Sequence, residues 1–187
     1  MSRFSLNYLG TFFIIISFLS FFNIIYSYYF NLYFNIGAYI FTLFISLIIG
    51  AILLFKRKID KKITIYEKII IVIIGYILLP IIISIPYYLS IYNISLIDCY
   101  FEAISGFTST GFTIIENIKH LDESLIIWRS TSQWIGGMYF LFSIVLLTDI
   151  FDNSLKKSLT NFISFNTSEV FKQSFKILIL YIILTPL

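Results

Sequence analysis

Long apolar runs dominate the chain, and four of them are each long enough to cross a lipid bilayer as a helix. A membrane-spanning helix needs about 20 consecutive, mainly apolar residues. The four runs cover residues 6–29, 36–55, 67–89 and 124–148. A fifth run begins near residue 170 and is still apolar at residue 187. We expect it to be the first part of a further span that is cut short in this chain.

The stretch between the third and fourth runs, residues 93–124, is too polar and too broken to form a span. Its first part, residues 98–107, is apolar on one face and about three helical turns long. We therefore predict a half-helix that enters the membrane without crossing it. An extended turn rich in Ser, Thr and Gly should follow at residues 108–113. Pro80 and Pro86 lie in the third run, where we expect them to kink the helix.

Basic residues gather in two places between the apolar runs. Residues 56–62 contain five cations and one anion, and Lys156 and Lys157 follow the fourth run. Excess Lys and Arg in short loops marks the cytoplasmic side of a membrane protein. Two crossings separate the clusters, so both fall on the same side. This predicts a multi-pass protein of the plasma membrane with a cytoplasmic N-terminus, whose half-helix enters from outside.

The composition agrees with a lipid environment. Hydrophobic residues make up 59% of the chain and charged residues 12%, against about 45–50% and about 25% in soluble domains. The mean hydropathy is +0.93. Cys99 and His120 do not form a nucleophile–base pair or a metal cluster, and no glycine-rich phosphate loop is present. We therefore expect no enzyme, no cofactor and no nucleic-acid partner.

The turn at residues 108–113 has a composition suited to a dehydrated cation. Such an ion needs oxygen ligands, and irregular backbone at membrane depth can supply carbonyl oxygens where it lines a water-filled cavity. Gly111 permits a positive φ, so successive carbonyls can point the same way. The carbonyl end of the preceding half-helix also favours a cation, because the helix dipole gives it partial negative charge.

Two motifs in this region resemble the Trk/Ktr family of potassium-uptake subunits. Residues 101–113 read Phe-Glu-Ala-Ile-Ser-Gly-Phe-Thr-Ser-Thr-Gly-Phe-Thr and are similar to the family's first pore loop. Residues 128–137 read Trp-Arg-Ser-Thr-Ser-Gln-Trp-Ile-Gly-Gly and are similar to its signature at the start of the following helix. The resemblance implies four span–loop–span repeats around one pore, potassium as the transported ion, and a cytoplasmic nucleotide-binding regulatory subunit.

The expected fold is an all-α membrane protein of potassium-channel-like architecture. Residues 1–62 would form an N-terminal transmembrane helix pair with a basic cytoplasmic loop. Residues 63–152 would form the first helix–pore loop–helix repeat, and residues 153–187 a cytoplasmic linker and the start of a second repeat. The other repeats would come from the same chain or from a homo-oligomer, with membrane lipid around them.

The resemblance also implies which residues form the selectivity filter. The expected carbonyl ligands are Ser109, Thr110, Gly111 and Phe112, with the potassium ion held at Thr110 and Gly111. Thr108 and Thr113 are expected to support the filter. The filter resembles the Thr-Val-Gly-Tyr-Gly loop of potassium channels, but Thr113 stands where the second glycine would be. A looser filter is therefore implied, with Gly111 as its indispensable position.

Charged residues near the loop need partners at membrane depth, because an unpaired charge there is costly. Glu102 could hydrogen-bond the filter backbone or face an outer water-filled vestibule. Arg129 could pair with Glu102 or Asp98, or extend to the outer interface. We expect both Glu102 and Arg129 to support the filter. Gly136 and Gly137 would allow another helix or the loop to approach closely.

Three alternatives remain open on the sequence alone. A secondary transporter with a broken helix would need a second interrupted segment, which is not visible in the sequence. A non-transporting assembly subunit would tolerate Gly111→Asp, and a degenerate gene fragment would account for the abrupt end. The sequence leaves open the choice of K+ or Na+, any coupling ion and the mode of gating.

Overall fold

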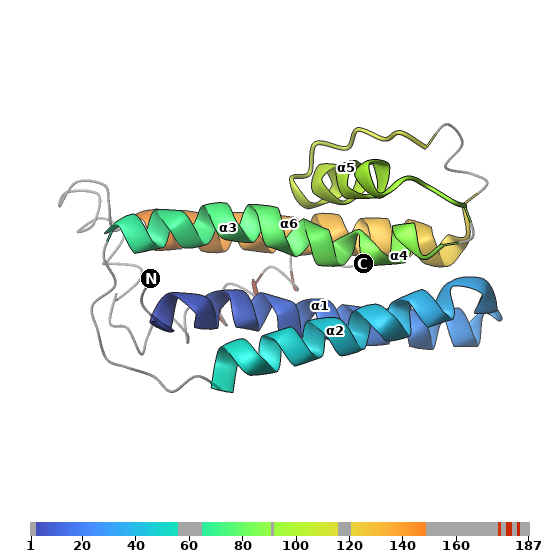
Figure 1. The fold of residues 1–187 in the computed structure, drawn as a ribbon, viewed down its shortest axis with the longest axis horizontal. Coiled ribbons are helices and arrows are strands. Elements are labelled where there is room, and N and C mark those ends of the chain that lie inside the picture. Colours follow the sequence, from blue (N-terminus) through green and yellow to red (C-terminus); the bar gives the residue numbers. More distant parts are fainter. Residues whose placement is uncertain are drawn as a thin grey trace. The chain divides into compact units, whose positions relative to one another are not determined.

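The computed structural model describes residues 3–55, 65–90, 92–115 and 121–148, and also residues 176, 179, 180 and 183. Their secondary structure is helical, with turns and one extended segment (Figure 1). The helices are α1 (Arg3–Tyr29), the 3-10 turn η1 (Tyr33–Asn35), α2 (Ile36–Phe55), α3 (Ile65–Ile83), α4 (Ile85–Tyr88), α5 (Leu96–Phe107) and α6 (Glu123–Thr148). The chain divides into two compact units, Met1–Gly137 and Met138–Leu187, and the boundary falls within α6. All residues predicted for the site belong to the first unit.

Three helical stretches are long and apolar enough to span a membrane. They are Asn7–Tyr29, Tyr33–Phe55 and Tyr66–Tyr88, so the first three predicted spans are helices that could cross a membrane by length and composition. Helix α6 is long enough but carries a polar run at residues 129–133 and does not join this group. Its role as a fourth span stays a prediction. The basic clusters, His120 and most of the expected fifth span lie outside the described residues.

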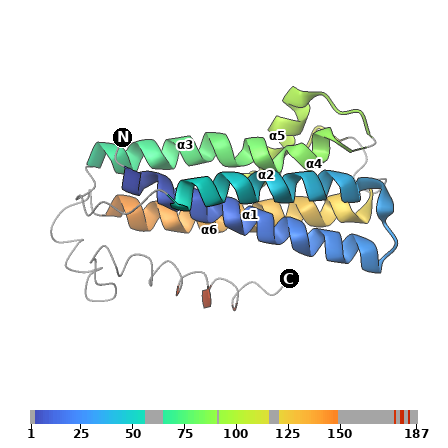
Figure 2. The same cartoon turned by 60° about the horizontal axis from the view of Figure 1, so that its bottom comes forward.

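Helices α1 and α2 form a closely packed antiparallel hairpin (Figures 1 and 2). Small residues allow this approach, because a Cβ added to Gly10 would lie 2.9 Å from the Cβ of Leu53. Ser20 Oγ donates to the carbonyl oxygen of Tyr39 on the opposite helix at 2.7 Å. Small and hydroxyl-bearing residues are the usual means by which helices associate inside a membrane.

The third span is broken between α3 and α4. Helix α3 continues past Pro80 to Ile83, and the break falls at Ser84, just before Pro86 in the first turn of α4. The carbonyl oxygen of Ile83, the last residue of α3, accepts Nε1–H of Trp128 at 2.9 Å. A side chain of α6 therefore binds the backbone next to the break.

Helix α5 lies beside α3 and α4, near the end where α4 is found (Figures 1 and 2). It begins at Leu96, two residues before the predicted start, with Ser95 as its cap. The Ser95 hydroxyl oxygen accepts the backbone N–H of Asp98 at 3.2 Å, which satisfies one of the free donors of the first turn. The extended segment after α5, residues 108–115, runs back along the helix toward the end where the helix began (Figure 1).

Candidate functional site

The C-terminal end of α5 is packed against the middle of its neighbours. Gly136 of α6 contacts the carbonyl group of Phe107 so closely that a Cβ added there would overlap the Phe107 oxygen. On the other side, the rings of Phe107 and Tyr76 of α3 lie 5.7 Å apart in an edge-on arrangement. The close approach predicted for Gly136 is thus present, and its partner is the last residue of α5.

The chain reverses directly after Phe107. The backbone N–H of Thr110 donates to the carbonyl oxygen of Ser105 at 3.1 Å, and the N–H of Ser109 donates to that of Gly106 at 2.9 Å. The reversal requires positive φ angles at two positions, 57° at Ser109 and 78° at Gly111. Glycine accepts such an angle at no steric cost, whereas a side chain is strained there.

The carbonyl groups of the turn differ in their hydrogen bonds. Among the described residues, no donor reaches the carbonyl oxygens of Ser109, Thr110 or Gly111. All residues from 108 to 114 are exposed, and a Cβ added to Gly111 would meet nothing within 4 Å. These three carbonyls are therefore available to a ligand.

The carbonyl of Phe112 differs from its neighbours. Its oxygen accepts the Ser105 hydroxyl at 2.6 Å and Nη2 of Arg129 at 3.4 Å. Both donors belong to the helices behind the turn. The four predicted filter positions are thus not equivalent here, since three have free carbonyls and Phe112 is anchored to the scaffold.

Glu102 binds the returning segment from within α5. Its carboxylate accepts the Thr113 hydroxyl at 3.1 Å and the backbone N–H of Ile114 at 3.2 Å. The same carboxylate forms an ion pair with Nη1 of Arg129 at 3.0 Å, with side-chain exposures of 2% and 11% for Glu102 and Arg129. Of the partners expected for Arg129, the structure selects Glu102. Asp98 instead accepts the Ser95 hydroxyl at 2.7 Å.

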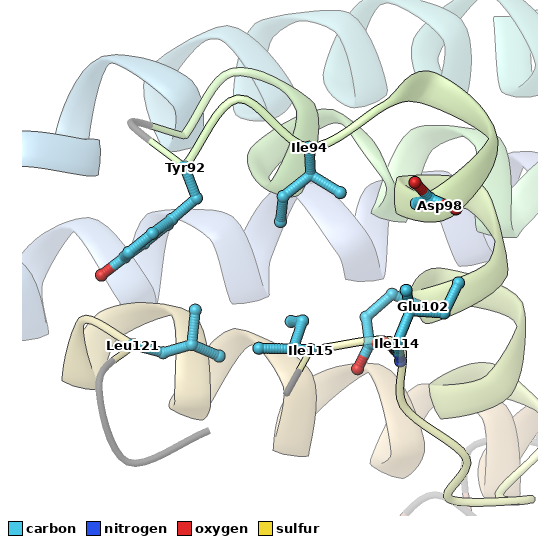
Figure 3. A pocket seen from close by; sticks show the side chains of 7 residues that line it. All are labelled: Tyr92, Ile94, Asp98, Glu102, Ile114, Ile115 and Leu121. Carbon is cyan, nitrogen blue, oxygen red and sulfur yellow. Dashed lines mark hydrogen bonds between the residues drawn. The ribbon is translucent and has the colours of Figure 1, made fainter. Parts of the chain in front are cut away.

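A cavity of about 170 Å³ lies behind the returning segment (Figure 3). Its lining residues are Asp98 and Glu102 of α5 and also Tyr92, Ile94, Ile114, Ile115 and Leu121. The surface of the cavity is almost entirely apolar, so it offers few polar partners to ordered water.

Two residues that hold the site were not selected from the sequence. Ser105 hydrogen-bonds both Thr110 and Phe112, and Trp128 is buried and donates to the carbonyl oxygen of Ile83 beside the break in the third span. Ser105 lies at the end of α5 within the motif that carried the resemblance, so its place next to the turn was a usable signal. The role of Trp128 depends on a carbonyl 45 residues away, which no local pattern reveals.

A sequence model of the cation transport protein family TrkH matches residues 35–185, which is most of the chain. The chain belongs to this family. The TrkH match extends over every residue of the turn and over the start of α6, so the resemblance seen in the two motifs is confirmed at family level.

Individual relatives match shorter parts of this TrkH-family chain. An uncharacterized cation transporter of Methanocaldococcus jannaschii is 47% identical over 58 residues, covering 31% of this chain and 12% of the relative. The Trk system potassium uptake protein TrkH of Salmonella typhimurium is 31% identical over 99 residues, covering 52% and 20%. The Trk system potassium uptake protein TrkI of Halomonas elongata is 40% identical over 55 residues, covering 29% and 11%. The chain thus matches a fifth or less of the length of each of these relatives.

Proposed function

We propose that this chain supplies one pore-loop repeat of a potassium-transporting membrane protein, with the α5 loop as its share of the ion pathway. One observation carries the proposal. Helix α5 ends against the middle of α3 and α6, and the chain then turns back toward the end where it entered. With α3 and α6 as spans, this segment dips into the membrane and leaves on the same side.

The depth of the turn follows from helix geometry. Gly136 is the fourteenth residue of α6, which starts at Glu123, so it lies about 20 Å along the helix at 1.5 Å per residue. The hydrocarbon core is about 30 Å thick. A Phe107 carbonyl held at Gly136 would then lie deep in the membrane, where exposed backbone is tolerated only beside water or an ion.

The proposed ligands are the free carbonyls of Ser109, Thr110 and Gly111, with potassium held at Thr110 and Gly111. Carbonyl oxygens in a ring can replace the hydration shell of a potassium ion. Phe112 was expected to be a fourth ligand, but its carbonyl already accepts two hydrogen bonds. We propose that it anchors the turn from behind, together with the Glu102–Arg129 pair.

One loop cannot surround an ion, so further loops are needed. We propose that they come from other repeats of the same protein or from copies of this chain. A cytoplasmic nucleotide-binding regulatory subunit is the proposed partner, by analogy with the family. The basic clusters at residues 56–62 and 156–157 support a cytoplasmic N-terminus, with the loop entering from outside.

The direct test is rubidium uptake by cells that lack their own potassium uptake, with Gly111→Ser compared with the unsubstituted protein. The serine would be strained at φ 78°, by about 1–2 kcal/mol, and would redirect the carbonyls of the turn. We expect uptake to fall at least about tenfold, which equals 1.4 kcal/mol. Gly37→Ser is the matched control, because the space around Gly37 is open.

Equal uptake by Gly111→Ser and the unsubstituted protein, at equal abundance in the membrane, would remove Gly111 from the ion path. An absence of uptake by the unsubstituted protein, with the known uptake system of the same cells as positive control, would favour a non-transporting assembly role.

A further inference from the structure

Asp122 caps the first turn of α6. Its carboxylate Oδ1 accepts the backbone N–H of Ser124 at 3.3 Å. Its backbone carbonyl oxygen accepts the N–H groups of Leu125 and Ile126 at 2.9 and 3.2 Å. Aspartate is among the preferred residues at a helix N-cap, because its side chain satisfies free donors of the first turn. Capping uses only one of the two carboxylate oxygens.

The remaining groups of Asp122 tie two other segments to this point. Carboxylate Oδ2 accepts Nδ2–H of Asn35 at 2.8 Å, and the backbone N–H donates to the Tyr92 hydroxyl at 2.8 Å. Tyr92 precedes α5, and Asn35 belongs to the turn between α1 and α2. One residue therefore joins the entry of the loop, its exit and the N-terminal hairpin.

The hairpin makes two more contacts with the same turn of α6. The Tyr39 hydroxyl donates to Ser124 Oγ at 3.0 Å, and Nδ2 of Asn23 donates to the Ser124 carbonyl oxygen at 3.2 Å. Asn23, Asn35 and Tyr39 are all at most 1% exposed. Hydrogen bonds to a charged group are stronger than neutral ones, and more so where water is excluded. Of the three hydrogen bonds between the hairpin and this end of α6, the Asn35–Asp122 bond is the one made to a carboxylate.

We propose that the N-terminal hairpin is a positioning element of the pore loop, and that the Asn35–Asp122 hydrogen bond is the contact through which it acts. The inference rests on the proposed function. The inner end of the loop is fixed by Gly136 and Glu102, whereas its outer ends meet at Asp122. A shift of Asp122 moves both outer ends relative to this fixed inner end, which strains the segments between them and changes the spacing of the free carbonyls in the pore.

The test exchanges the two side chains. Asn35→Asp sets two carboxylates against each other and breaks the contact. Adding Asp122→Asn to it restores one donor and one acceptor with their places exchanged, and the amide oxygen still caps Ser124. Asp122→Asn alone is the mild control, because Asn35 has a buried Oδ1 without a partner and can rotate it toward the new amide.

The readout is rubidium uptake with sodium as competitor, normalised to protein in the membrane. For Asn35→Asp we expect the rubidium KM to rise about fivefold and inhibition by sodium to strengthen, with recovery to within about twofold in the exchanged pair. A purely structural role would lower abundance and maximal rate and leave the KM and the sodium competition unchanged. That result, or failure of the exchange to restore the KM, would overturn the inference.

A second measurement does not depend on transport. Ile114→Cys places a thiol on the exposed returning segment, and the single natural cysteine, Cys99, is fully buried. Labelling of intact cells with a membrane-impermeant maleimide should be at least about threefold faster with Asn35→Asp and return to its original rate in the exchanged pair. An unchanged rate in Asn35→Asp would overturn the inference even if uptake by this variant is impaired. Loss of uptake in the unsubstituted protein would overturn only the proposed function.

Discussion

The α1–α2 hairpin and the α5 loop both contain buried polar groups, and they differ in which groups supply the hydrogen bonds to them. In the hairpin, continuous helices bond their own backbone, and small side chains such as Ser20 add contacts between helices. In the loop, the helical backbone ends at Phe107. The side chains of Ser105, Glu102 and Arg129 then hydrogen-bond backbone groups of the segment that follows. The loop therefore depends on individual side chains where the hairpin depends on regular geometry, so single substitutions should affect the loop more.

Glu102→Gln is the strongest test of whether the loop depends on single side chains. The substitution leaves Arg129 buried with an unpaired charge, and loss of one partner of a buried pair costs about 3–5 kcal/mol. We expect uptake to be abolished and the detergent-solubilised protein to lose its monodisperse peak at a clearly lower temperature.

Two variants show whether the pairing is responsible. Asp98 lies one turn earlier on α5, and its carboxylate accepts the hydroxyl of the neighbouring Ser95, so Asp98→Asn should behave like the unsubstituted protein. Glu102→Gln combined with Arg129→Met removes both charges and should recover part of the lost stability. Equal stability of the single and double variants would show that the ion pair does not hold the loop.

Gly136→Ala tests the close approach at the inner end of the loop. The added Cβ would overlap the Phe107 carbonyl oxygen, and neither backbone can move without displacing a helix. Overpacking costs about 1–3 kcal/mol, and we expect this variant to lie near the upper end. Thermal stability and rubidium uptake should both fall, and normal values for both would mean that α5 does not end at Gly136.

Gly10→Ala tests the same kind of contact in the hairpin and should have the smallest effect. Its Cβ would lie 2.9 Å from the Cβ of Leu53, so the two helices would have to separate by a few tenths of an ångström. We expect a loss of about 1 kcal/mol in thermal stability, with Gly37→Ala as the unaffected control. A loss as large as that of Gly136→Ala would remove the proposed difference between hairpin and loop.

Helix positions were well predicted from the sequence, because the membrane sets their length and solvent. The second run, residues 36–55, matches α2 at both ends, and the half-helix was predicted within two residues of its start. The break in the third run falls at Ser84, and Pro80 is accommodated inside α3. Two prolines were visible in the sequence, but the sequence pattern did not indicate which one lies at the break.

The contacts of the loop could be predicted only in part. Arg129 needed a partner at depth, and this requirement pointed to Glu102 or Asp98 without deciding between them. The engaged carbonyl of Phe112 could not be foreseen, because it depends on the rotamer of Ser105 and on the reach of Arg129. The Asn35–Asp122 bond joins residues 87 positions apart, and polar residues in turns give no signal of so distant a partner.

The contact of Phe107 with Gly136 also sets an order of assembly. Ribosomal synthesis makes α5 before α6, yet the carbonyl end of α5 gains its neighbour only once α6 has formed its first four turns. Of the neighbours Tyr76 and Gly136, Phe107 has only Tyr76 of α3 until then. If the loop enters the membrane as proposed, we expect it to reach its final position together with α6.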